Sequence, residues 1–378
     1  MYRVIVIDSD PSIHAALRPL SDGSLAQIVQ ATSNAEAAAI LEGGQDFDLA
    51  LVDIDGDGAA GLDVFRSLTR RDVRVARIGL TSTGDIGRIR DALHGGAVDI
   101  LIKPIVLDDV SRTFERVMKV IETRRRNWNE RAEYSALQRE IQIAAAMQQG
   151  ILPKQYPDYP GLEVFGTMIP AKVMGGDLFD VFALSETKVG FFIGDVSGKS
   201  VPAAFYMAVA RTLLRSISEN IENPGDCFAK VDALLSGHEI PGTFVTAFLG
   251  VLDTRNFDIL YANAGHPLPM IVKADGRIVE LEDGRGTVLG IGAGLPYEQA
   301  RTTLLPGECL VAHTDGVAEA FNVYNEPYGE ARLAEVLQAN VAAGPEEICG
   351  RIVDSVTAFC AGRDQHDDLT VLALKRAG

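Results

Sequence analysis

The first hundred residues alternate short apolar runs with amphipathic segments. The apolar runs are Val4–Ile7, Ile28–Gln30, Leu49–Val52, Val75–Leu80 and Val98–Ile102. The amphipathic segments are Pro11–Leu20, Asn34–Glu42, Leu62–Thr69 and Ile86–His94. This alternation predicts a doubly wound α/β domain, in which helices cover both faces of a five-stranded parallel sheet. Functional side chains in such a domain gather at the carboxyl ends of the strands.

A long segment without proline or glycine follows, from Leu107 to Gln149. Its apolar residues recur at helical spacing, at Val110, Phe114, Val117, Ile121, Tyr134, Leu137, Ile141 and Ala144. This spacing predicts a long helix that ends at Gly150. Residues 107–150 are therefore expected to form a helical linker that could pair with a second copy as a coiled-coil homodimer.

After residue 160 the apolar runs are joined by short turns, and the helical segments are grouped between them. The expected strands are Leu162–Met168, Val189–Ile193, Phe244–Leu252, Ile259–Tyr261, Pro269–Lys273, Glu308–His313 and Leu369–Leu374. The expected helices are Val201–Ile217, Asp226–Leu235, Ala331–Ala339 and Pro345–Phe359. Such an order favours antiparallel sheets with helices outside them, an α+β layered domain.

Composition excludes several classes of partner. The formal net charge of −17 would repel nucleic acid, and no basic cluster compensates for it. The four cysteines lie far apart, which is typical of small core residues in a reducing compartment rather than of a zinc site. No stretch approaches the roughly 20 apolar residues that cross a bilayer. We expect a cytoplasmic protein that binds neither nucleic acid nor membrane.

Acidic residues stand at the ends of the first and third predicted strands. Asp8 and Asp10 follow the first strand, and Asp53 ends the third. Thr81 ends the fourth strand and Lys103 the fifth, so all five residues are expected at one edge of the sheet. Crowded carboxylates favour a divalent cation, and oxygen ligands suit Mg²⁺. A carboxylate there can also attack a phosphoryl group, whose oxygens a hydroxyl and an ammonium would then bind.

With these residues, positions 1–120 resemble a response-regulator receiver domain, which has a flavodoxin-like fold. The resemblance implies that Asp53 is phosphorylated by a cognate histidine kinase or phosphotransfer protein. It implies that Thr81 is the switch hydroxyl and Lys103 the phosphate-sensing lysine. It also implies a Mg²⁺ ion, whose ligands would be Asp8, Asp10 and Asp53.

The segment departs from the receiver pattern at several positions. Ser9 stands where the family usually has a second acidic residue, so either Asp10 substitutes for it or metal affinity is weaker. Gly61 fits the family, whereas the loop after Asp53 lacks the usual proline. Asp55 and Asp57 in that loop could add metal ligands.

A second set of acidic residues lies in the C-terminal half, at strand ends or beside glycine. The segments are Gly175-Gly176-Asp177-Leu178-Phe179-Asp180, Gly194-Asp195-Val196-Ser197-Gly198, Thr314-Asp315-Gly316 and His366-Asp367-Asp368-Leu369-Thr370. Any one alone is typical of a turn. Together they predict a carboxylate cluster that is stable only around cations. Two Mn²⁺ or Mg²⁺ ions about 3.5–4 Å apart form the usual clamp for phosphate-ester hydrolysis, with a water molecule as nucleophile.

These segments resemble the metal-dependent PPM/PP2C-type phosphoserine/threonine phosphatases, in the bacterial branch similar to SpoIIE. The resemblance runs from about Ala144 to Arg376 and implies a phosphatase domain over 150–378 with an αββα layered sandwich. It also covers the approach Met147-Gln148-Gln149-Gly150-Ile151-Leu152-Pro153.

The phosphatase resemblance assigns a role to each acidic position. Asp195 would bridge both ions, and Val196 would contribute its backbone carbonyl. Asp315 and Asp367 would complete one ion, and Asp177 would bind the other. Two further acidic residues, Asp180 and Asp368, would support the ligands from behind.

The two resemblances together predict a two-component response regulator whose output is a protein phosphatase. Related phosphatases imply a phosphorylated STAS-type anti-sigma-factor antagonist as substrate, in a partner-switching pathway. The alternative is a non-catalytic sigma-factor adaptor with RssB-like architecture. An adaptor would be expected to have lost several of the four main carboxylates, which this chain keeps. His266 and His313 could be general acids, but a turn position and a strand position explain them more simply.

Overall fold

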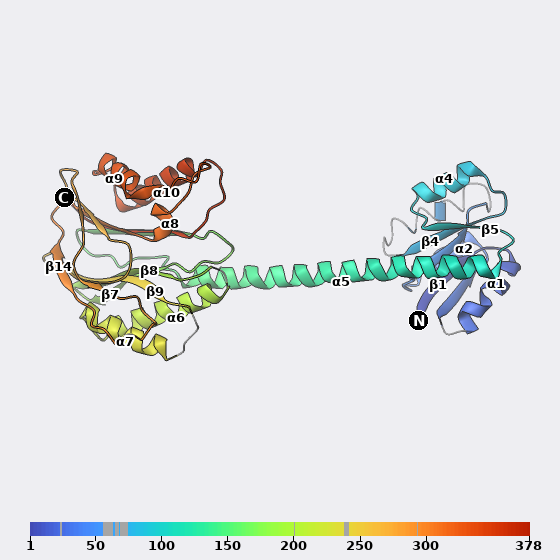
Figure 1. Cartoon of the computed structure of the whole chain (residues 1–378), viewed down its shortest axis with the longest axis horizontal. Helices are drawn as coiled ribbons and strands as arrows, with labels where there is room; N and C mark the ends of the chain where they lie inside the picture. The colour runs from blue at the N-terminus through green and yellow to red at the C-terminus, as the bar shows by residue number, and fades with distance from the viewer. Residues whose placement is uncertain are drawn as a thin grey trace. The chain divides into compact units, whose positions relative to one another are not determined.

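The computed structural model describes residues 1–22, 25–55, 63–64, 68, 75–199, 201–237, 242–292 and 294–378. The chain divides into two compact units, Met1–Leu137 and Gln138–Gly378 (Figure 1). Gly61, Asp57, Ser200 and most of the expected helix Leu62–Thr69 lie outside the described residues. No helix in the described part of the chain is long and apolar enough to cross a membrane.

The first unit is built on a five-stranded sheet in the order β2-β1-β3-β4-β5. All its neighbouring strands pair in parallel. The strands are β1 (Tyr2–Ile7), β2 (Ala26–Ala31), β3 (Leu49–Asp53), β4 (Ala76–Thr81) and β5 (Asp99–Ile102). The helices described beside them are α1 (Pro11–Asp22), α2 (Asn34–Glu42), α4 (Ile86–His94) and the first part of α5 (Leu107–Ile151).

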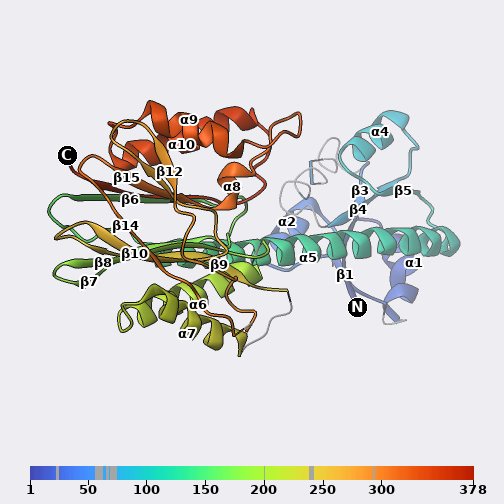
Figure 2. The same cartoon turned by 60° about the vertical axis from the view of Figure 1, so that its left-hand side comes forward.

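Apolar residues of β1 alternate between the two faces of this sheet. Val4 and Val6 pack on the face covered by α1 and α5, whereas Ile5 and Ile7 pack on the face that includes Ala37 of α2. Side chains of a strand point to opposite faces in turn, so a strand that is apolar throughout must be covered on both sides. Figure 2 shows the helices lying on the two sides of the sheet. The doubly wound prediction is confirmed.

The second unit contains two sheets whose strands pair antiparallel, except that the short β13 pairs in parallel with β10. One has the order β13-β10-β9-β8-β7, with β14 also paired to β10, and the other has the order β12-β11-β15-β16-β6. The first sheet contains β7 (Leu178–Ser185), β8 (Lys188–Val196), β9 (Val245–Asp253), β10 (Asp258–Ala264), β13 (Arg285–Gly286) and β14 (Ala300–Thr303). The second contains β6 (Leu162–Ile169), β11 (Met270–Val272), β12 (Ile278–Glu280), β15 (Cys309–His313) and β16 (Leu369–Arg376).

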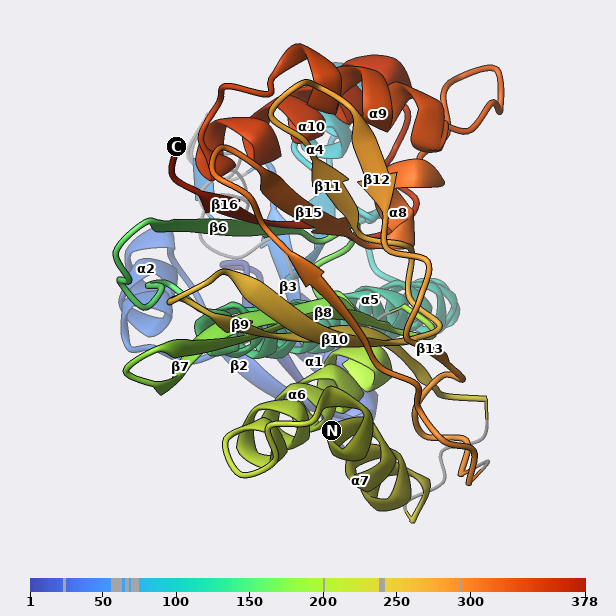
Figure 3. The same ribbon diagram turned by 90° about the vertical axis from the view of Figure 1, so that its left-hand side faces the viewer.

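The two sheets pack face to face and carry helices on their outer sides, as Figure 3 shows. Phe191 and Phe248 of one sheet meet Leu310 and Leu372 of the other in a shared core. The helices are α6 (Val201–Ser218), α7 (Pro224–Ser236), α8 (Asp315–Ala318), α9 (Gly329–Ala339) and α10 (Pro345–Cys360). Helices α6 and α7 cover the first sheet, and α9 and α10 cover the second. The expected αββα sandwich is confirmed.

Helix α5 contributes to the core of each unit with a different part of its length. Val110, Phe114, Val117 and Ile121 are buried in the core of the first unit. Near the other end, Ala145 packs against Met174 and Ala204 of the second unit. Tyr134 and Leu137 between these regions are exposed. The predicted helix is therefore present, and the coiled-coil homodimer stays a prediction.

Candidate functional site

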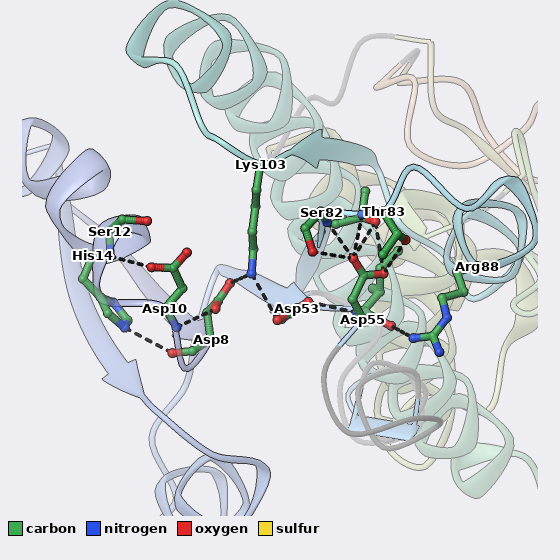
Figure 4. A network of polar contacts seen from close by, with 12 residues as sticks. Asp8, Asp10, Ser12, His14, Asp53, Asp55, Ser82, Thr83, Arg88 and Lys103 are labelled. Atoms are coloured by element: carbon green, nitrogen blue, oxygen red, sulfur yellow. Dashed lines mark hydrogen bonds and ion pairs between the residues drawn. The ribbon is translucent and has the colours of Figure 1, made fainter.

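Lys103 joins two carboxylates at the carboxyl edge of the parallel sheet. Its ammonium lies 2.6 Å from Asp8 Oδ2 and 3.1 Å from Asp53 Oδ2, as Figure 4 shows. Asp8 is buried, and the Lys103 ammonium is its counter-charge. Burial alone would lower the pKa of Lys103, but the bonds to both carboxylates outweigh burial and raise it. The structure thus brings together three of the predicted receiver residues.

Asp10 lies directly after β1, beside Asp8, and its side chain has a second use. Its backbone N–H donates to Asp8 Oδ1 at 2.9 Å, whereas its own Oδ1 accepts the Ser12 N–H at 2.9 Å. The carboxylate therefore caps the first turn of α1, where helix N–H groups lack partners. Among the described ion pairs, Asp10 makes none with Lys103. Hydrogen bonds from Ser12 and the nearby Lys103 ammonium lower the pKa of Asp10. The substitution of Asp10 for the acid missing at Ser9 stays a prediction.

Asp55 holds the loop that follows β4. The Thr81 hydroxyl donates to Asp55 Oδ2 at 2.9 Å, and the N–H groups of Ser82 and Thr83 donate to the same oxygen at 2.6 and 3.1 Å. Figure 4 shows the carboxylate turned toward this loop. Although burial opposes it, this set of hydrogen bonds lowers the pKa of Asp55. Thr81, the predicted switch residue, thus already donates its hydroxyl to the carboxylate of Asp55.

In the second unit, the acidic residues stand at ends of elements that meet at one rim. Asp195 lies near the end of β8, and Asp177 immediately precedes β7. Asp315 begins α8, and Asp367 and Asp368 precede β16. These positions come from both sheets, so the layered fold brings together residues that are far apart in sequence.

Two glycines allow the backbone segments at this rim to approach closely. A Cβ atom at Gly316 would lie 1.9 Å from the Asp368 carbonyl oxygen. A Cβ atom at Gly175 would lie 2.2 Å from Asp368 Oδ2. A larger residue at Gly316 would displace the backbone, and one at Gly175 would displace the Asp368 carboxylate. Gly316 is therefore required for the acidic segments to come together, and Gly175 leaves room for the Asp368 carboxylate between them.

Asp177 and Asp368 are fixed by hydrogen bonds. Asp177 Oδ2 accepts the hydroxyls of Thr314 and Thr370 at 2.7 and 2.6 Å. Asp368 accepts the N–H groups of Ala171 and Gly176 at 2.8 and 2.6 Å. Charge-assisted hydrogen bonds of this kind fix a carboxylate in one orientation. These two residues thereby tie the Gly175-Gly176-Asp177 segment to the second sheet.

The carboxylates at the rim oppose one another's ionisation. Burial and the neighbouring Asp315 raise the pKa of Asp195 to about 7. Burial and Asp195 raise the pKa of Asp177 well above its ordinary value, and burial and Asp367 raise that of Asp315. Like charges in a poorly solvated place account for all three shifts. A divalent cation would remove this conflict.

The donor set at the rim fits such a cation in its chemistry. All the candidate donors are hard oxygen atoms, which Mg²⁺ and Mn²⁺ prefer. Nevertheless, within the described ranges no three His, Cys, Asp or Glu side chains are arranged so that they could already hold a metal ion. Asp177 and Asp368 are occupied by the bonds described above, and Asp367 is paired with Lys199 at 2.8 Å. Side-chain adjustment would thus accompany metal binding.

Asp180 does not belong to this rim. It lies within β7, and its Oδ2 is 2.6 Å from Arg211 and 3.0 Å from Arg215 of α6. Leu178 and Phe182 lie on the same face of β7 as Asp180, and both pack in the core beneath α6 and α7. Alternation along a strand therefore places Asp180 on the outer face of its sheet. This corrects the prediction that it supports the metal ligands.

Several residues at the rim were not predicted from the sequence. Thr314 and Thr370 bind Asp177, and Lys199 binds Asp367. The amide of Gln148, near the end of α5, donates to the Gly175 carbonyl at 2.5 Å and accepts the Gly175 N–H at 3.2 Å. All four residues lie in or beside the segments that carried the resemblance. Their partners are distant in sequence, so no local pattern could have revealed the contacts.

His266 and His313 are both buried. The Thr246 hydroxyl and His266 Nδ1 are hydrogen bonded at 3.0 Å. Burial and the neighbouring His313 lower the pKa of His266 to about 3, so its imidazole is neutral near pH 7. A neutral buried imidazole is a poor general acid, which favours the simpler structural explanation.

Fold and site together define a class: a response regulator that joins a receiver domain to a PP2C-type phosphatase domain. Family models support both parts. Residues 4–115 match the response regulator receiver domain, and residues 185–377 match Stage II sporulation protein E (SpoIIE). The chain belongs to the SpoIIE family.

Curated relatives and solved structures agree with this assignment. Protein IcfG of Synechocystis is 30% identical, over 63% of this chain and 41% of IcfG. Phosphoserine phosphatase RsbU of Bacillus subtilis is 28% identical, over 63% of this chain and 70% of RsbU. The SiaA-PP2C domain of Pseudomonas aeruginosa shares the fold, with a TM-score of 0.58, 21% identity and coverage of 65% of this chain and 98% of that domain. The chain thus spans less than half the length of IcfG and somewhat more than two thirds of RsbU.

Proposed function

We propose that this protein is a response regulator whose output is a Mn²⁺- or Mg²⁺-dependent phosphoserine/threonine protein phosphatase. The observation that carries the proposal is the convergence of Asp177, Asp195, Asp315 and Asp367 at one rim of the αββα sandwich. Burial and mutual repulsion raise the pKa values of Asp177, Asp195 and Asp315, which supports a rim that is short of positive charge. The similarity to a phosphoserine phosphatase supports the reaction class.

The residues divide into ligands and residues that hold them. Asp195, the Val196 carbonyl, Asp315 and Asp367 would hold the ions, and Asp177 would do so once its side chain adjusts. Bound Mn²⁺ or Mg²⁺ would supply positive charge to the phosphoryl oxygens and lower the pKa of the attacking water. Thr314 and Thr370 orient Asp177 by their hydroxyls, and Asp368 fixes the Gly176 backbone. Loss of such supporting contacts typically lowers metal affinity or activity by about 10- to 100-fold.

Phosphorylation of Asp53 would regulate this output through α5. The apolar stripe that contains Val110 and Val117 belongs to the receiver core, so a change in that core acts on the start of the helix. Gln148 near the end of the same helix holds both backbone groups of Gly175, two residues before Asp177. A small rotation of the helix would therefore move the Gly175 backbone, which leads to Asp177 at the rim. In the receiver itself, Asp8, Asp10 and Asp53 would hold Mg²⁺, and Lys103 and Thr81 would bind the phosphoryl group.

The resemblance to SpoIIE-type phosphatases implies the partners. The proposed substrate is a serine-phosphorylated STAS-type anti-sigma-factor antagonist, and the proposed phosphodonor is a cognate histidine kinase or phosphotransfer protein. A homodimer through α5 and a cytoplasmic location remain predictions from the sequence. The adaptor alternative is not favoured, because all four main carboxylates are present and their surroundings keep them crowded and in need of a cation.

The test is phosphate release from an aryl phosphate by the full chain, with Mn²⁺ and with chelator. We expect Mn²⁺-dependent turnover that Asp195→Asn abolishes. Asp354→Asn, an exposed position on α10, is the matched control and should retain turnover. Absence of both turnover and calorimetric Mn²⁺ binding in the wild type would favour the adaptor instead.

A further inference from the structure

Lys199 places a positive charge inside the acidic rim. Its ammonium lies 2.8 Å from Asp367 Oδ2 and donates to the His366 carbonyl at 2.7 Å. The two paired side chains are 31% and 27% exposed, so the contact is half-shielded from water. Among the described residues, Lys199 is the only lysine or arginine that forms an ion pair with any of the five carboxylates Asp177, Asp195, Asp315, Asp367 and Asp368. The chain thus supplies one positive charge at the rim, where the proposed function places two divalent ions.

The position of Lys199 in the chain keeps its charge at the rim. It follows Asp195 by four residues, after Gly198, whose φ of +101° suits glycine and few other residues. Its ammonium also acts on Asp315, where it opposes the rise in pKa that burial and Asp367 cause. The Lys199 ammonium therefore offsets part of the negative charge of Asp367 and Asp315. Its backbone belongs to the segment that carries Asp195, a third proposed metal ligand.

An ammonium bound to a carboxylate and a divalent cation on the same carboxylate repel each other strongly at such distances. We infer that Lys199 is an internal counter-ion that competes with the divalent metal for Asp367. Once displaced from Asp367, its ammonium binds the anionic phosphoryl group of the substrate. This inference rests on the proposed function and names a substrate-binding residue for it. Lysine suits both tasks, because its charge sits on a flexible stem and makes undirected contacts with oxygen.

A single substitution should then have two opposite effects. Lys199→Met removes the competitor, so Mn²⁺ should bind at least about tenfold more tightly, as expected when a nearby like charge is lost. The same variant lacks the displaced ammonium, so the KM for an aryl phosphate at saturating Mn²⁺ should rise several-fold. Lys199→Arg keeps the charge and should stay within about threefold of the wild type in both quantities. A merely structural role would weaken metal binding and substrate binding together.

The experiment is a calorimetric titration of the metal-free full chain with MnCl₂, followed by steady-state kinetics. Lys199→Gln serves as a second neutral variant, and thermal unfolding of each variant guards against loss of the fold. Tighter Mn²⁺ binding by the Met and Gln variants, but not by the Arg variant, supports the inference. Unchanged or weaker Mn²⁺ binding by both neutral variants overturns it.

The titration also separates this inference from the proposed function. If the wild type binds Mn²⁺ and Asp195→Asn does not, the metal site stands, and an unchanged Lys199→Met overturns only the counter-ion role. If neither the wild type nor Lys199→Met binds Mn²⁺, both the metal site and the counter-ion role are overturned. Binding by Lys199→Met alone supports the competition directly.

Discussion

The hydroxyl of Thr81 donates to the carboxylate of Asp55, at 2.9 Å from Oδ2. Thr81 is the residue from which a response to phosphorylation of Asp53 was expected. The Asp55 carboxylate therefore already accepts the hydroxyl hydrogen bond that a phosphoryl group on Asp53 would need. Ser82 and Thr83 bind the same carboxylate through their N–H groups. A phosphoryl group on Asp53 has to compete with Asp55 for this loop.

Removal of this carboxylate should loosen the loop without unfolding the domain. We expect Asp55→Ala to lower the hydrogen-exchange protection of the Ser82 and Thr83 amides by about 10- to 100-fold. The basis is that a hydrogen bond to a charged acceptor contributes roughly 1.5–3 kcal/mol. The matched control is Asp85→Ala, which removes the cap of α4 through Gly87 and Arg88. If both variants left the Ser82 amide equally protected, Asp55 would not hold the loop.

Much of the fold could be predicted from the sequence because burial leaves a periodic trace. Val4–Ile7 of β1 are all apolar because both faces of the strand are covered there, and the stripe from Val110 to Ile121 is apolar because it packs in the receiver core. Strand β7 was not predicted, because the buried Asp180 interrupts its apolar pattern. Its charge is tolerated through two arginines on α6, whose positions local sequence does not reveal.

Less of the candidate site could be predicted, because its contacts join distant segments. The acidic positions were visible beside glycines at strand ends. The hydroxyls on Asp177 and the ammonium on Asp367 depend on how two sheets pack, so only the structure shows them. Asp10 is a further example: its position after the first strand predicts a metal ligand, and only the structure shows that its side chain also caps the start of α1.

Lys103 should be necessary for the stability of the receiver unless a metal ion replaces it. Lys103→Met leaves Asp8 buried beside Asp53 without a counter-charge, so the free energy of unfolding should fall by about 2–5 kcal/mol. Millimolar Mg²⁺ should recover part of this loss, because the ion takes over the neutralisation. Urea unfolding with Mg²⁺ and with chelator measures both effects. Lys119→Met, at an exposed position of α5, is the control and should show neither effect.

Gln148 should be needed for activity although it is far from any proposed ligand in sequence. Gln148→Ala removes both hydrogen bonds to the Gly175 backbone, so the segment that leads to Asp177 loses its anchor on α5. We expect turnover of an aryl phosphate to fall at least about tenfold, in line with the loss of two buried hydrogen bonds. Gln149→Ala, the exposed neighbour, should remain active. Equal activity of the two variants would count against the contact.

The crowded carboxylates predict how stability depends on pH in the absence of metal. The pKa of Asp195 is about 7 in the folded protein against 3.8 ordinarily, so the folded state holds this proton more tightly than the unfolded state. Its contribution to stability is complete below about pH 4 and is lost as the pH rises through 7. Thermal unfolding in chelator should therefore show a decline over this range that is smaller in Asp195→Asn. Saturating Mn²⁺ should reverse the decline, and identical pH profiles for the two proteins would refute this explanation.

The central claim is that a phosphorylated receiver controls a metal-dependent phosphoprotein phosphatase in one chain. The most direct measurement is phosphate release from a serine-phosphorylated STAS-type protein by the full chain in Mn²⁺, with and without beryllofluoride as a phosphoryl mimic at Asp53. We predict release that requires Mn²⁺ and Asp195 and whose rate changes when the mimic binds, with no change in Asp53→Ala. No release of phosphate under either condition, from a chain that is folded and loaded with Mn²⁺, would contradict the claim.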